Sequence, residues 1–470
     1  MKSACVSLSL TNIMNSMAFS EISVRIQNFR AIKDANLKLN GLTVLSGLNG
    51  SGKSTVAKTL YYAIKTALNY DEILDGLLRR KFDRAFDEFS FFIDDLVRSM
   101  SRYGLVDKEN FSAEDLFSPL AGKTGKEFIR CLEDALDKIT VLSEKIESVS
   151  EERRRNFLRS LLRRANQKLV FDDDNPVDLN NSQSGINCAV SQNAWELISQ
   201  TEEKKEKRSL PAFIKLCSSV FGVEIPDGFS YQEGDVEIFD KDEKRVRPIQ
   251  DFKIVHYIDT PWVIDFPNNR FPFITLPHAH WKDILEKIDT PDDFSGHSSI
   301  AEDIAKTIIK GYATRRSNEP RLFFERTDNV RFLLRDAATG IKGLSIIQRL
   351  AEKHAFNEKT LLILDEPESH LHPQWIVEYA RILVLMQKEL GVKMLIASHS
   401  PDMIDALQTF SESEGIADRT NFYLAEESAS DSFLYTYEQL GNSIAKIFKV
   451  FNVAATRIAN YEKDLGKNAN

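Results

Sequence analysis

The sequence lacks the features that mark membrane and secreted proteins. Its apolar runs stay below the roughly 18 residues that a membrane-spanning helix requires. The four cysteines, Cys5, Cys131, Cys188 and Cys217, are scattered and show no CxxC spacing, which argues against both a disulfide framework and a zinc ribbon. We therefore predict a cytoplasmic protein that makes no contact with a membrane.

A strong charge of one sign is also missing. The formal net charge of −9 argues against a protein that wraps nucleic acid over its whole surface. Basic stretches at 151–157 and 159–164 could form a local face for DNA, although a solvated helix face is the favoured interpretation. With 470 residues, 42% of them hydrophobic and 28% charged, the chain has the composition of a soluble globular protein of two or three domains.

The first 65 residues divide into two segments. Residues 1–20 hold a weak apolar stretch interrupted by Ser, Thr and Asn, so we expect a disordered leader rather than a signal peptide. A start codon assigned upstream of Met14 or Met17 is an alternative. Residues 21–65 alternate apolar and polar side chains, then continue through a glycine-rich loop into a sequence of helical periodicity.

The remainder is expected to be a helical insertion followed by α/β sequence. Residues 66–250 are mainly charged and helix-forming, and the near-heptad apolar spacing from Leu132 to Val149 is typical of a helical arm or coiled-coil-like hairpin. Within this insertion, the polar segment 171–187 is predicted to be an exposed loop. Residues 251–470 return to short apolar runs that alternate with helices, which is the pattern of a sheet covered on both faces.

The glycine-rich loop has the spacing of a phosphate-binding loop. "GLNGSGKS" fits G-x-x-x-x-G-K-[ST] without mismatch, between a predicted strand and a predicted helix. Its backbone N–H groups and the following helix N-terminus would face the phosphates of ATP, the lysine would reach the β- and γ-phosphates, and the serine hydroxyl would bind Mg²⁺. The predicted ATP-binding residues of this loop are Gly47, Leu48, Asn49, Gly50, Ser51, Gly52, Lys53, Ser54 and Thr55.

Two later motifs supply polar groups at strand ends. "LLILDEP" is a buried strand that ends at Asp365, which is predicted to be a direct or water-mediated partner of Mg²⁺. The adjacent Glu366 can orient or deprotonate the attacking water. "LIASHSP" ends another buried strand at His399, which could contact the γ-phosphate, with a structural histidine as the alternative.

These motifs together predict the fold class. We expect an α/β P-loop NTPase with a mixed or parallel sheet, interrupted by the large helical insertion. No internal repeat is present.

The order of P-loop, "LDEP" and strand-end histidine resembles the ATP-binding-cassette ATPases. That resemblance makes Glu366 the catalytic carboxylate and His399 the switch histidine, and it implies a head-to-tail dimer around two ATP molecules. The pair Phe29-Arg30 resembles the nucleotide-edge motif of the SMC, Rad50 and RecF branch, so Arg30 is a further ATP-binding candidate.

The same resemblance suggests residues that contact the neighbouring subunit. "ATGIKGLS" is the best match to the signature motif, although it departs from LSGGQ, and it offers Thr339, Gly340 and Lys342 as contacts in trans. Ser369 and His370 would lie at the dimer interface. The Q-loop is not evident, because Asp259 occupies its expected position in place of glutamine.

A narrower resemblance concerns "TGIK", "DEPESHLHPQW" and "ASHSP". Together they are similar to stand-alone ATPases of bacterial defence islands, the relatives of the overcoming-lysogenisation-defect enzymes and of the PARIS ATPase subunit. The resemblance implies an oligomeric ATPase that senses a phage component and controls a separate toxin or nuclease. No DxD pair follows Ser400, so a Toprim or HNH-type nuclease would be another chain.

Three other classes of function compete with this interpretation. A RecF- or SMC-like repair ATPase would hold duplex DNA. A transporter subunit is disfavoured by the missing LSGGQ, and a non-enzymatic scaffold would not depend on Glu366. The H-x-H pairs at 278–280 and 370–372 could each offer two metal ligands, but no third ligand pattern accompanies them.

Overall fold

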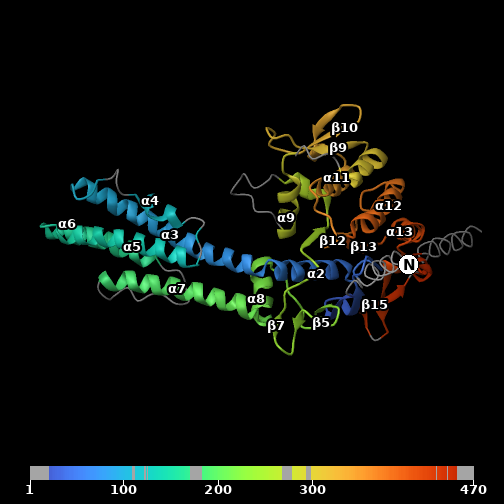
Figure 1. The fold of residues 1–470 in the computed structure, drawn as a ribbon, viewed down its shortest axis with the longest axis horizontal. Helices are drawn as coiled ribbons and strands as arrows, with labels where there is room; N and C mark the ends of the chain where they lie inside the picture. Colours follow the sequence, from blue (N-terminus) through green and yellow to red (C-terminus); the bar gives the residue numbers. More distant parts are fainter. Residues whose placement is uncertain are drawn as a thin grey trace, which may run out of the picture. The chain divides into compact units, whose positions relative to one another are not determined.

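The computed structural model forms two compact units (Figure 1). Unit 1 comprises Met1–Leu68 and Ser209–Asn470, and unit 2 comprises Asn69–Arg208. The predicted leader lies outside the described residues, as does most of the predicted 171–187 loop. The structure describes residues 21–107, 112–120, 123, 125–169, 183–266, 278–292, 298–429, 431–441 and 443–451.

Unit 1 is built on a ten-stranded sheet with the order β5-β4-β1-β2-β15-β14-β3-β13-β12-β8. Its strands are β1 (Ile22–Phe29), β2 (Ile32–Lys38), β3 (Leu42–Ser46), β4 (Ser230–Glu233), β5 (Val236–Glu237), β8 (Ile254–Ile258), β12 (Thr360–Asp365), β13 (Lys393–Ala397), β14 (Thr420–Ser428) and β15 (Asp431–Gly441).

The half of this sheet from β14 to the edge strand β8 is parallel, and the other half is mixed. Strand β3 pairs in parallel with β13 and β14, and β12 pairs in parallel with β13 and β8. The pairs β1–β2, β1–β4 and β14–β15 are antiparallel. Every residue of β3, β12 and β13 is buried, as expected for apolar runs covered on both faces. The predicted fold class is therefore confirmed.

Helices and two small sheets complete unit 1. Residues of the helices from 279 onwards form one continuous apolar core with residues of β3, β12 and β13. The helices are α2 (Lys53–Leu68), α8 (Leu210–Phe221), α9 (Ala279–Ile288), α10 (Ser299–Asp303), α11 (Thr339–Glu352), α12 (Pro373–Leu390) and α13 (Pro401–Ser413), with short turns η3 (Pro261–Asp265), η4 (Ile304–Ile309), η5 (Leu334–Asp336) and η6 (Ala417–Arg419). The small sheets contain β6 (Phe239–Asp240) with β7 (Arg245–Val246), and β9 (Gly311–Thr314), β10 (Phe323–Arg326) and β11 (Arg331–Leu333).

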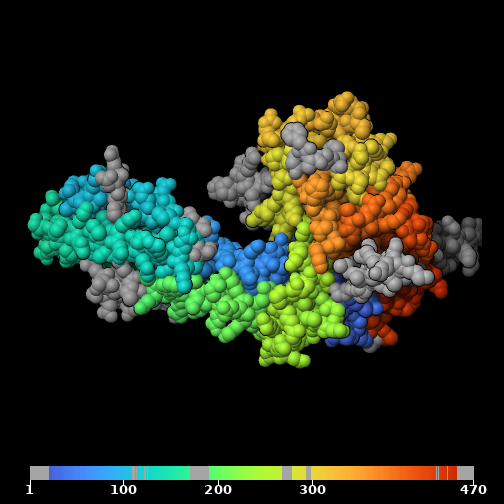
Figure 2. All heavy atoms as spheres, in the orientation of Figure 1, coloured from blue at the N-terminus to red at the C-terminus, as the bar shows by residue number. Residues whose placement is uncertain are grey.

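Unit 2 is helical (Figure 1) and has a hydrophobic core of its own. In the space-filling view of Figure 2 its surface runs from blue through cyan to green. In helix α5 the regularly spaced apolar residues lie on one buried face, which is formed by Leu132, Leu136, Ile139, Leu142 and Ile146. This face lies against the neighbouring helices, which supplies the burial that the spacing predicts. The elements are α3 (Tyr70–Arg102), α4 (Ala113–Phe117), η2 (Ser118–Leu120), α5 (Gly125–Glu147), α6 (Glu152–Lys168) and α7 (Gln183–Lys207).

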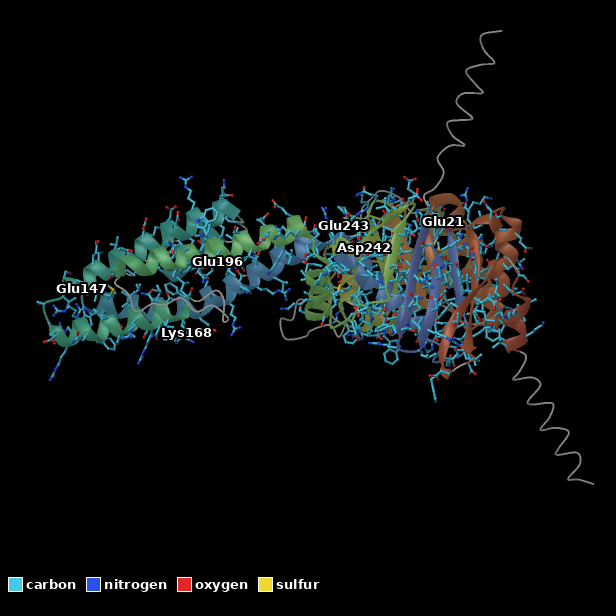
Figure 3. The ribbon with its side chains drawn as sticks, turned by 90° about the horizontal axis from the view of Figure 1, so that it is seen from below. Glu21, Glu147, Lys168, Glu196, Asp242 and Glu243 are labelled. Atoms are coloured by element: carbon cyan, nitrogen blue, oxygen red, sulfur yellow. The ribbon has the colours of Figure 1, made fainter. Side chains whose placement is uncertain are left out.

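The helical unit is shorter than the 66–250 insertion expected from sequence. Residues 209–250 belong to unit 1, because β4 pairs with β1 and the Glu233 carboxylate accepts hydrogen bonds from the backbone of Gln250 and Asp251. Two strands that pair across some 200 residues of intervening sequence leave no local pattern from which the pairing could be predicted. Asp242, labelled in Figure 3, lies exposed at the surface of this segment.

Candidate functional site

The phosphate-binding loop connects β3 to α2. Gly52 has a φ of 92°, and a Cβ atom there would lie 2.8 Å from Cγ1 of Ile32. At Gly47 a Cβ atom would lie 2.8 Å from Cβ of Ala425. Side chains at these two positions would therefore clash with neighbouring strands as well as strain the backbone, so the loop conformation requires glycine.

The other loop residues differ in exposure. Leu48, Asn49 and Gly50 are exposed, whereas Ser51 is buried and its carbonyl oxygen accepts a hydrogen bond of 3.2 Å from the Tyr437 hydroxyl. This bond ties the loop to β15. Thr55 is half-buried in the first turn of α2.

Lys53 begins α2 and its side chain folds back over the loop. Its Nζ donates to the carbonyl oxygens of Gly47, at 2.9 Å, and Leu48, at 3.1 Å. Burial lowers the pKa of Lys53, and the nearby carboxylates of Glu366, Asp365 and Glu368 oppose that shift. The ammonium thus lies inside the loop, where the phosphates of a bound nucleotide would be placed.

Asp365 has both of its carboxylate oxygens hydrogen-bonded. The Ser54 hydroxyl donates to Oδ1 at 3.1 Å, and the Tyr257 hydroxyl donates to Oδ2 at 3.0 Å. Burial raises the pKa of Asp365, while the two hydroxyl donors favour the charged form. The structure thus brings together Ser54 and Asp365, the two predicted partners of Mg²⁺. These hard oxygen donors fit that ion, which commonly binds few protein ligands and keeps several waters.

Glu366 directly follows β12 and has a left-handed backbone conformation. Its φ is 52°, and its backbone N–H donates to the carbonyl oxygen of Ala397 at 2.8 Å. Its Oε1 lies 3.3 Å from Nδ1 of His399, and both side chains are about two-fifths exposed, at 41% and 44%. The two predicted catalytic residues therefore lie next to each other and can be reached from solvent.

Arg30 lies in the turn between β1 and β2. Its guanidinium carbon is 5.0 Å from the centroid of the Phe29 ring and its side chain is exposed. The next residue, Ala31, is within 3.8 Å of the Cβ position of Gly52. The turn therefore borders the phosphate-binding loop.

A cavity of about 150 Å³ lies between the end of β12 and the start of α11. It is lined in part by Asp365, Glu366, Thr339, Gly340, Ser369 and His370. The structure thus places two signature-like residues, one catalytic candidate and both interface candidates around one space within a single chain.

Lys342 is placed differently from the other signature-like residues. It is buried, and its Nζ lies 2.6 Å from Oδ1 of Asp265 in η3. The resemblance suggested a contact with a neighbouring subunit. In this structure the ammonium instead joins α11 to η3, because the first turn of α11 points that side chain inwards.

Asp259 occupies the place expected for the Q-loop residue. It accepts a hydrogen bond from Trp281 Nε1 at 2.9 Å, and its Oδ2 lies 3.0 Å from His280 Nε2. Burial would raise the pKa of Asp259, but these partners outweigh burial and the pKa is lowered. The other ring nitrogen of His280 lies 3.1 Å from the Tyr62 hydroxyl.

Neither H-x-H pair forms a metal centre in the described part of the chain. Both ring nitrogens of His280 already have protein partners, and His372 accepts the backbone N–H of Gln374 at the start of α12. Within the described residues, no group of three or more His, Cys, Asp or Glu side chains could hold a metal ion.

Comparison with protein families matches two long segments of the chain. Residues 22–213 match an AAA ATPase domain, and residues 225–405 match a family described as "AAA domain, putative AbiEii toxin, Type IV TA system". Both matched models describe AAA domains, each over about two-fifths of the chain. The first match contains the phosphate-binding loop and the second contains Asp365, Glu366 and His399.

Similar curated proteins match only part of the chain. Protein ea59 of Escherichia phage lambda is 32% identical over 133 residues, which cover 26% of this chain and 23% of ea59. The energy-coupling factor transporter ATP-binding protein EcfA2 of Clostridium perfringens strain SM101 is 47% identical over 47 residues, or 10% of this chain and 16% of EcfA2. The matched part is thus less than a quarter of either relative.

Solved SMC head structures align over most of the chain at low similarity. The Smc head domain with an extended coiled coil, bound to the C-terminal domain of ScpA from Pyrococcus furiosus, has a TM-score of 0.33 and 11% identity, covering 93% of this chain and 99% of that one. The SmcHead bound to the C-winged helix domain of ScpA has a TM-score of 0.35 and 13% identity, covering 92% and 99%. These values are too low to carry a functional argument. Among the described helices, none is long and apolar enough to cross a membrane.

Proposed function

We propose that the chain binds ATP with Mg²⁺ and hydrolyses it to ADP and phosphate. The observation that carries the proposal is the hydrogen bond of 3.1 Å between Ser54 and Asp365 beside the buried ammonium of Lys53. Ser54 and Asp365 are 311 residues apart in the sequence. Together with Lys53 they supply the metal partners and the phosphate-binding cation of a P-loop ATPase.

Each residue then has a defined task. Lys53 neutralises charge on the β- and γ-phosphates. Ser54 and Asp365 would hold Mg²⁺, which on binding neutralises phosphate charge. Glu366 accepts a proton from the attacking water. The oxygen of that water bonds to the γ-phosphorus, and the bond from the γ-phosphorus to the oxygen that bridges it to the β-phosphate breaks. His399, 3.3 Å from Glu366, lies where it can orient that carboxylate or contact the γ-phosphate.

We further propose that the active form is a head-to-tail dimer or higher homo-oligomer. Thr339 and Gly340 begin α11, and a helix N-terminus favours a nearby phosphate. Ser369 and His370 border the same cavity, and His370 is exposed with a φ of 67°. A second chain could therefore contribute its α11 terminus to the nucleotide while it contacts this segment.

The cellular role we propose is that of a regulatory ATPase in a bacterial anti-phage system. A phage component would be the trigger, and a separate toxin or nuclease would be the controlled effector. The proposal is supported by the defence-ATPase resemblance of the motifs around Glu366 and His399, and by the toxin–antitoxin description of the family that matches residues 225–405. A DNA-repair ATPase is the alternative, in which duplex DNA would stimulate hydrolysis.

Phosphate release by the purified chain tests the enzymatic proposal. Lys53→Ala should abolish nucleotide binding, and Glu366→Gln should bind ATP normally but lose about 100-fold or more in kcat, the scale of removing a group that acts in the transition state. Lys282→Ala, which changes an exposed lysine on α9, is the matched control. Normal ATP binding by Lys53→Ala would refute the assignment of the pocket.

The same assay separates the two cellular roles. Duplex DNA should leave the rate unchanged if the chain is a defence regulator. Stimulation by DNA that falls steeply as salt rises from 50 to 200 mM would favour the repair alternative instead.

A further inference from the structure

Glu368 is a buried carboxylate two residues beyond Glu366, and none of the roles described above uses it. Its side chain is only 5% exposed, although it lies beside an exposed catalytic pair. Its Oε1 atom accepts three hydrogen bonds, from the Ser398 hydroxyl at 2.8 Å, the His399 backbone N–H at 3.0 Å and the Ser400 backbone N–H at 3.2 Å. One oxygen thus binds all three residues of the segment between β13 and α13.

The arrangement fixes the backbone of His399 from both sides. Ser398 also donates its backbone N–H to the carbonyl oxygen of Leu45 at 3.0 Å, which ties the segment to β3. Ser400 is the N-cap of α13 and accepts the N–H of Met403. Glu368 accepts the backbone N–H of His399 itself, so the position of His399 depends on this carboxylate as well as on the two flanking elements.

Glu368 also lies close to the imidazole of His399. The distance from Oε1 to Nδ1 is 3.6 Å, compared with 3.3 Å from Nδ1 to Oε1 of Glu366. The same imidazole nitrogen therefore lies near two carboxylates, one partly exposed and one buried. Both glutamates lie on one short segment with two consecutive turns. In these turns the backbone N–H of Ser369 donates to the carbonyl oxygen of Glu366, and that of Leu371 donates to the carbonyl oxygen of Glu368.

Three donors converge on Oε1 of Glu368, which suits the acceptor oxygen of a carboxylate. Hydrogen bonds to an ionised acceptor are about twice as strong as neutral ones, which allows a single oxygen to hold three donors. The second oxygen, Oε2, is buried and has no protein hydrogen-bond partner among the described residues. A neutral amide of the same shape would weaken all three bonds and bury an NH₂ group at the Oε2 position.

We propose that Glu368 is a positioning residue that sets His399 against Glu366 for hydrolysis. This inference rests on the proposed ATPase function. Glu368 does not touch the reacting atoms; it acts through the backbone and imidazole of His399. The competing possibility is that Glu368 stabilises unit 1 and has no specific effect on catalysis.

A double-mutant cycle distinguishes the two possibilities. Glu368→Gln should lower kcat about 10- to 100-fold, because a displacement of a catalytic group by about 1 Å can cost 100-fold. The Kd for a non-hydrolysable ATP analogue should stay within twofold of wild type, because the phosphate-binding loop is untouched. In a His399→Ala background, Glu368→Gln should change kcat by less than twofold, since the group it positions is already gone. Single-turnover measurements with excess enzyme give the His399→Ala rates.

Three results would overturn the inference. The first is full activity of Glu368→Gln. The second is a double mutant whose loss of kcat equals the product of the two single-mutant losses. The third is a loss of kcat in Glu368→Gln that is matched by an equal loss of affinity for the ATP analogue. Circular dichroism and thermal melting of each variant report whether it folds. Glu378→Gln, a change at a partly exposed ion pair on α12, is the matched control and should behave as wild type.

If Glu368→Gln fails to fold, Ser398→Ala removes one of the three donors with a smaller change. It should lower kcat several-fold, and this loss should also disappear in the His399→Ala background. A wild-type chain that binds ATP but does not hydrolyse it would refute the proposed function, and the inference with it. By contrast, normal wild-type turnover with an unaffected Glu368→Gln would refute the role of Glu368 alone.

Discussion

Replacing Tyr257 by phenylalanine isolates one hydroxyl group of the candidate site. The ring of Tyr257 is fully buried, so the substitution keeps its packing and removes only the donor to Asp365 Oδ2, at 3.0 Å. A hydrogen bond to a charged group contributes about 1.5–3 kcal/mol to stability. We therefore expect the free energy of unfolding of unit 1 to fall by about 2 kcal/mol at neutral pH.

The loss should depend on pH in a defined direction. The hydroxyl favours the charged form of Asp365, so its contribution is present while the carboxylate is ionised and is lost as the pH falls through the pKa of Asp365 in the folded chain. Burial has already raised that pKa, and removing the donor raises it further. The difference between wild type and Tyr257→Phe should therefore shrink between pH 7.5 and pH 4.5.

Urea denaturation followed by tryptophan fluorescence measures this difference. A Trp195→Phe background removes the tryptophan of unit 2, so that the remaining three report on unit 1. With an m-value of about 2–3 kcal/mol/M, the midpoint should fall by roughly 0.7–1 M at pH 7.5.

The control is Tyr423→Phe, which removes a hydroxyl that accepts the Lys38 backbone N–H at 2.9 Å. Its loss should be about 1 kcal/mol and should not change across this pH range. An unchanged midpoint for Tyr257→Phe at pH 7.5, or an equal loss at both pH values, would refute the reasoning about Asp365.

Three further outcomes are expected. Ser54→Ala should raise the Mg²⁺ concentration for half-maximal hydrolysis by about 10-fold or more, with Mg²⁺-free ATP binding unchanged in equilibrium dialysis. Gly340→Val would place Cβ 3.0 Å from the carbonyl oxygen of His370, so it should abolish ATP-dependent oligomers in analytical ultracentrifugation, whereas Gly343→Ala, whose Cβ meets nothing closer than 3.7 Å, should retain them. Residues 69–208, expressed alone, should show cooperative helical melting by circular dichroism because they bury their own core; a non-cooperative melt would contradict that.

The parts of the site that the sequence could predict are those with a contiguous signal. The loop at 47–55 lies within nine residues, and its glycines and lysine have one physical explanation. The strand that ends at Asp365 is similarly visible, because its apolar run and terminal acid are adjacent. Local spacing was also sufficient to predict the helical character of α5.

Contacts between distant segments could not be predicted in this way. The partner of Asp365 on β8 is 108 residues away, and the donors to Glu368 are 30 to 32 residues away. In the sequence, Tyr257 looks like any core residue of an apolar strand, and Glu368 looks like a solvent-exposed glutamate in a turn. The burial of Lys342 likewise follows from the orientation of α11 against η3, which no sequence period specifies.

The strand order has a consequence for synthesis of the chain. Strand β3, which carries the phosphate-binding loop, is flanked by β13 and β14, and the hydroxyl that holds Ser51 comes from Tyr437, 386 residues later. At about 5–20 residues per second, a ribosome needs roughly 20–80 s to connect these two residues. During that time the N-terminal strands lack their later partners, so the nucleotide pocket is completed only after Tyr437 has been synthesised. The incomplete chain exposes apolar surface of the kind that chaperones bind.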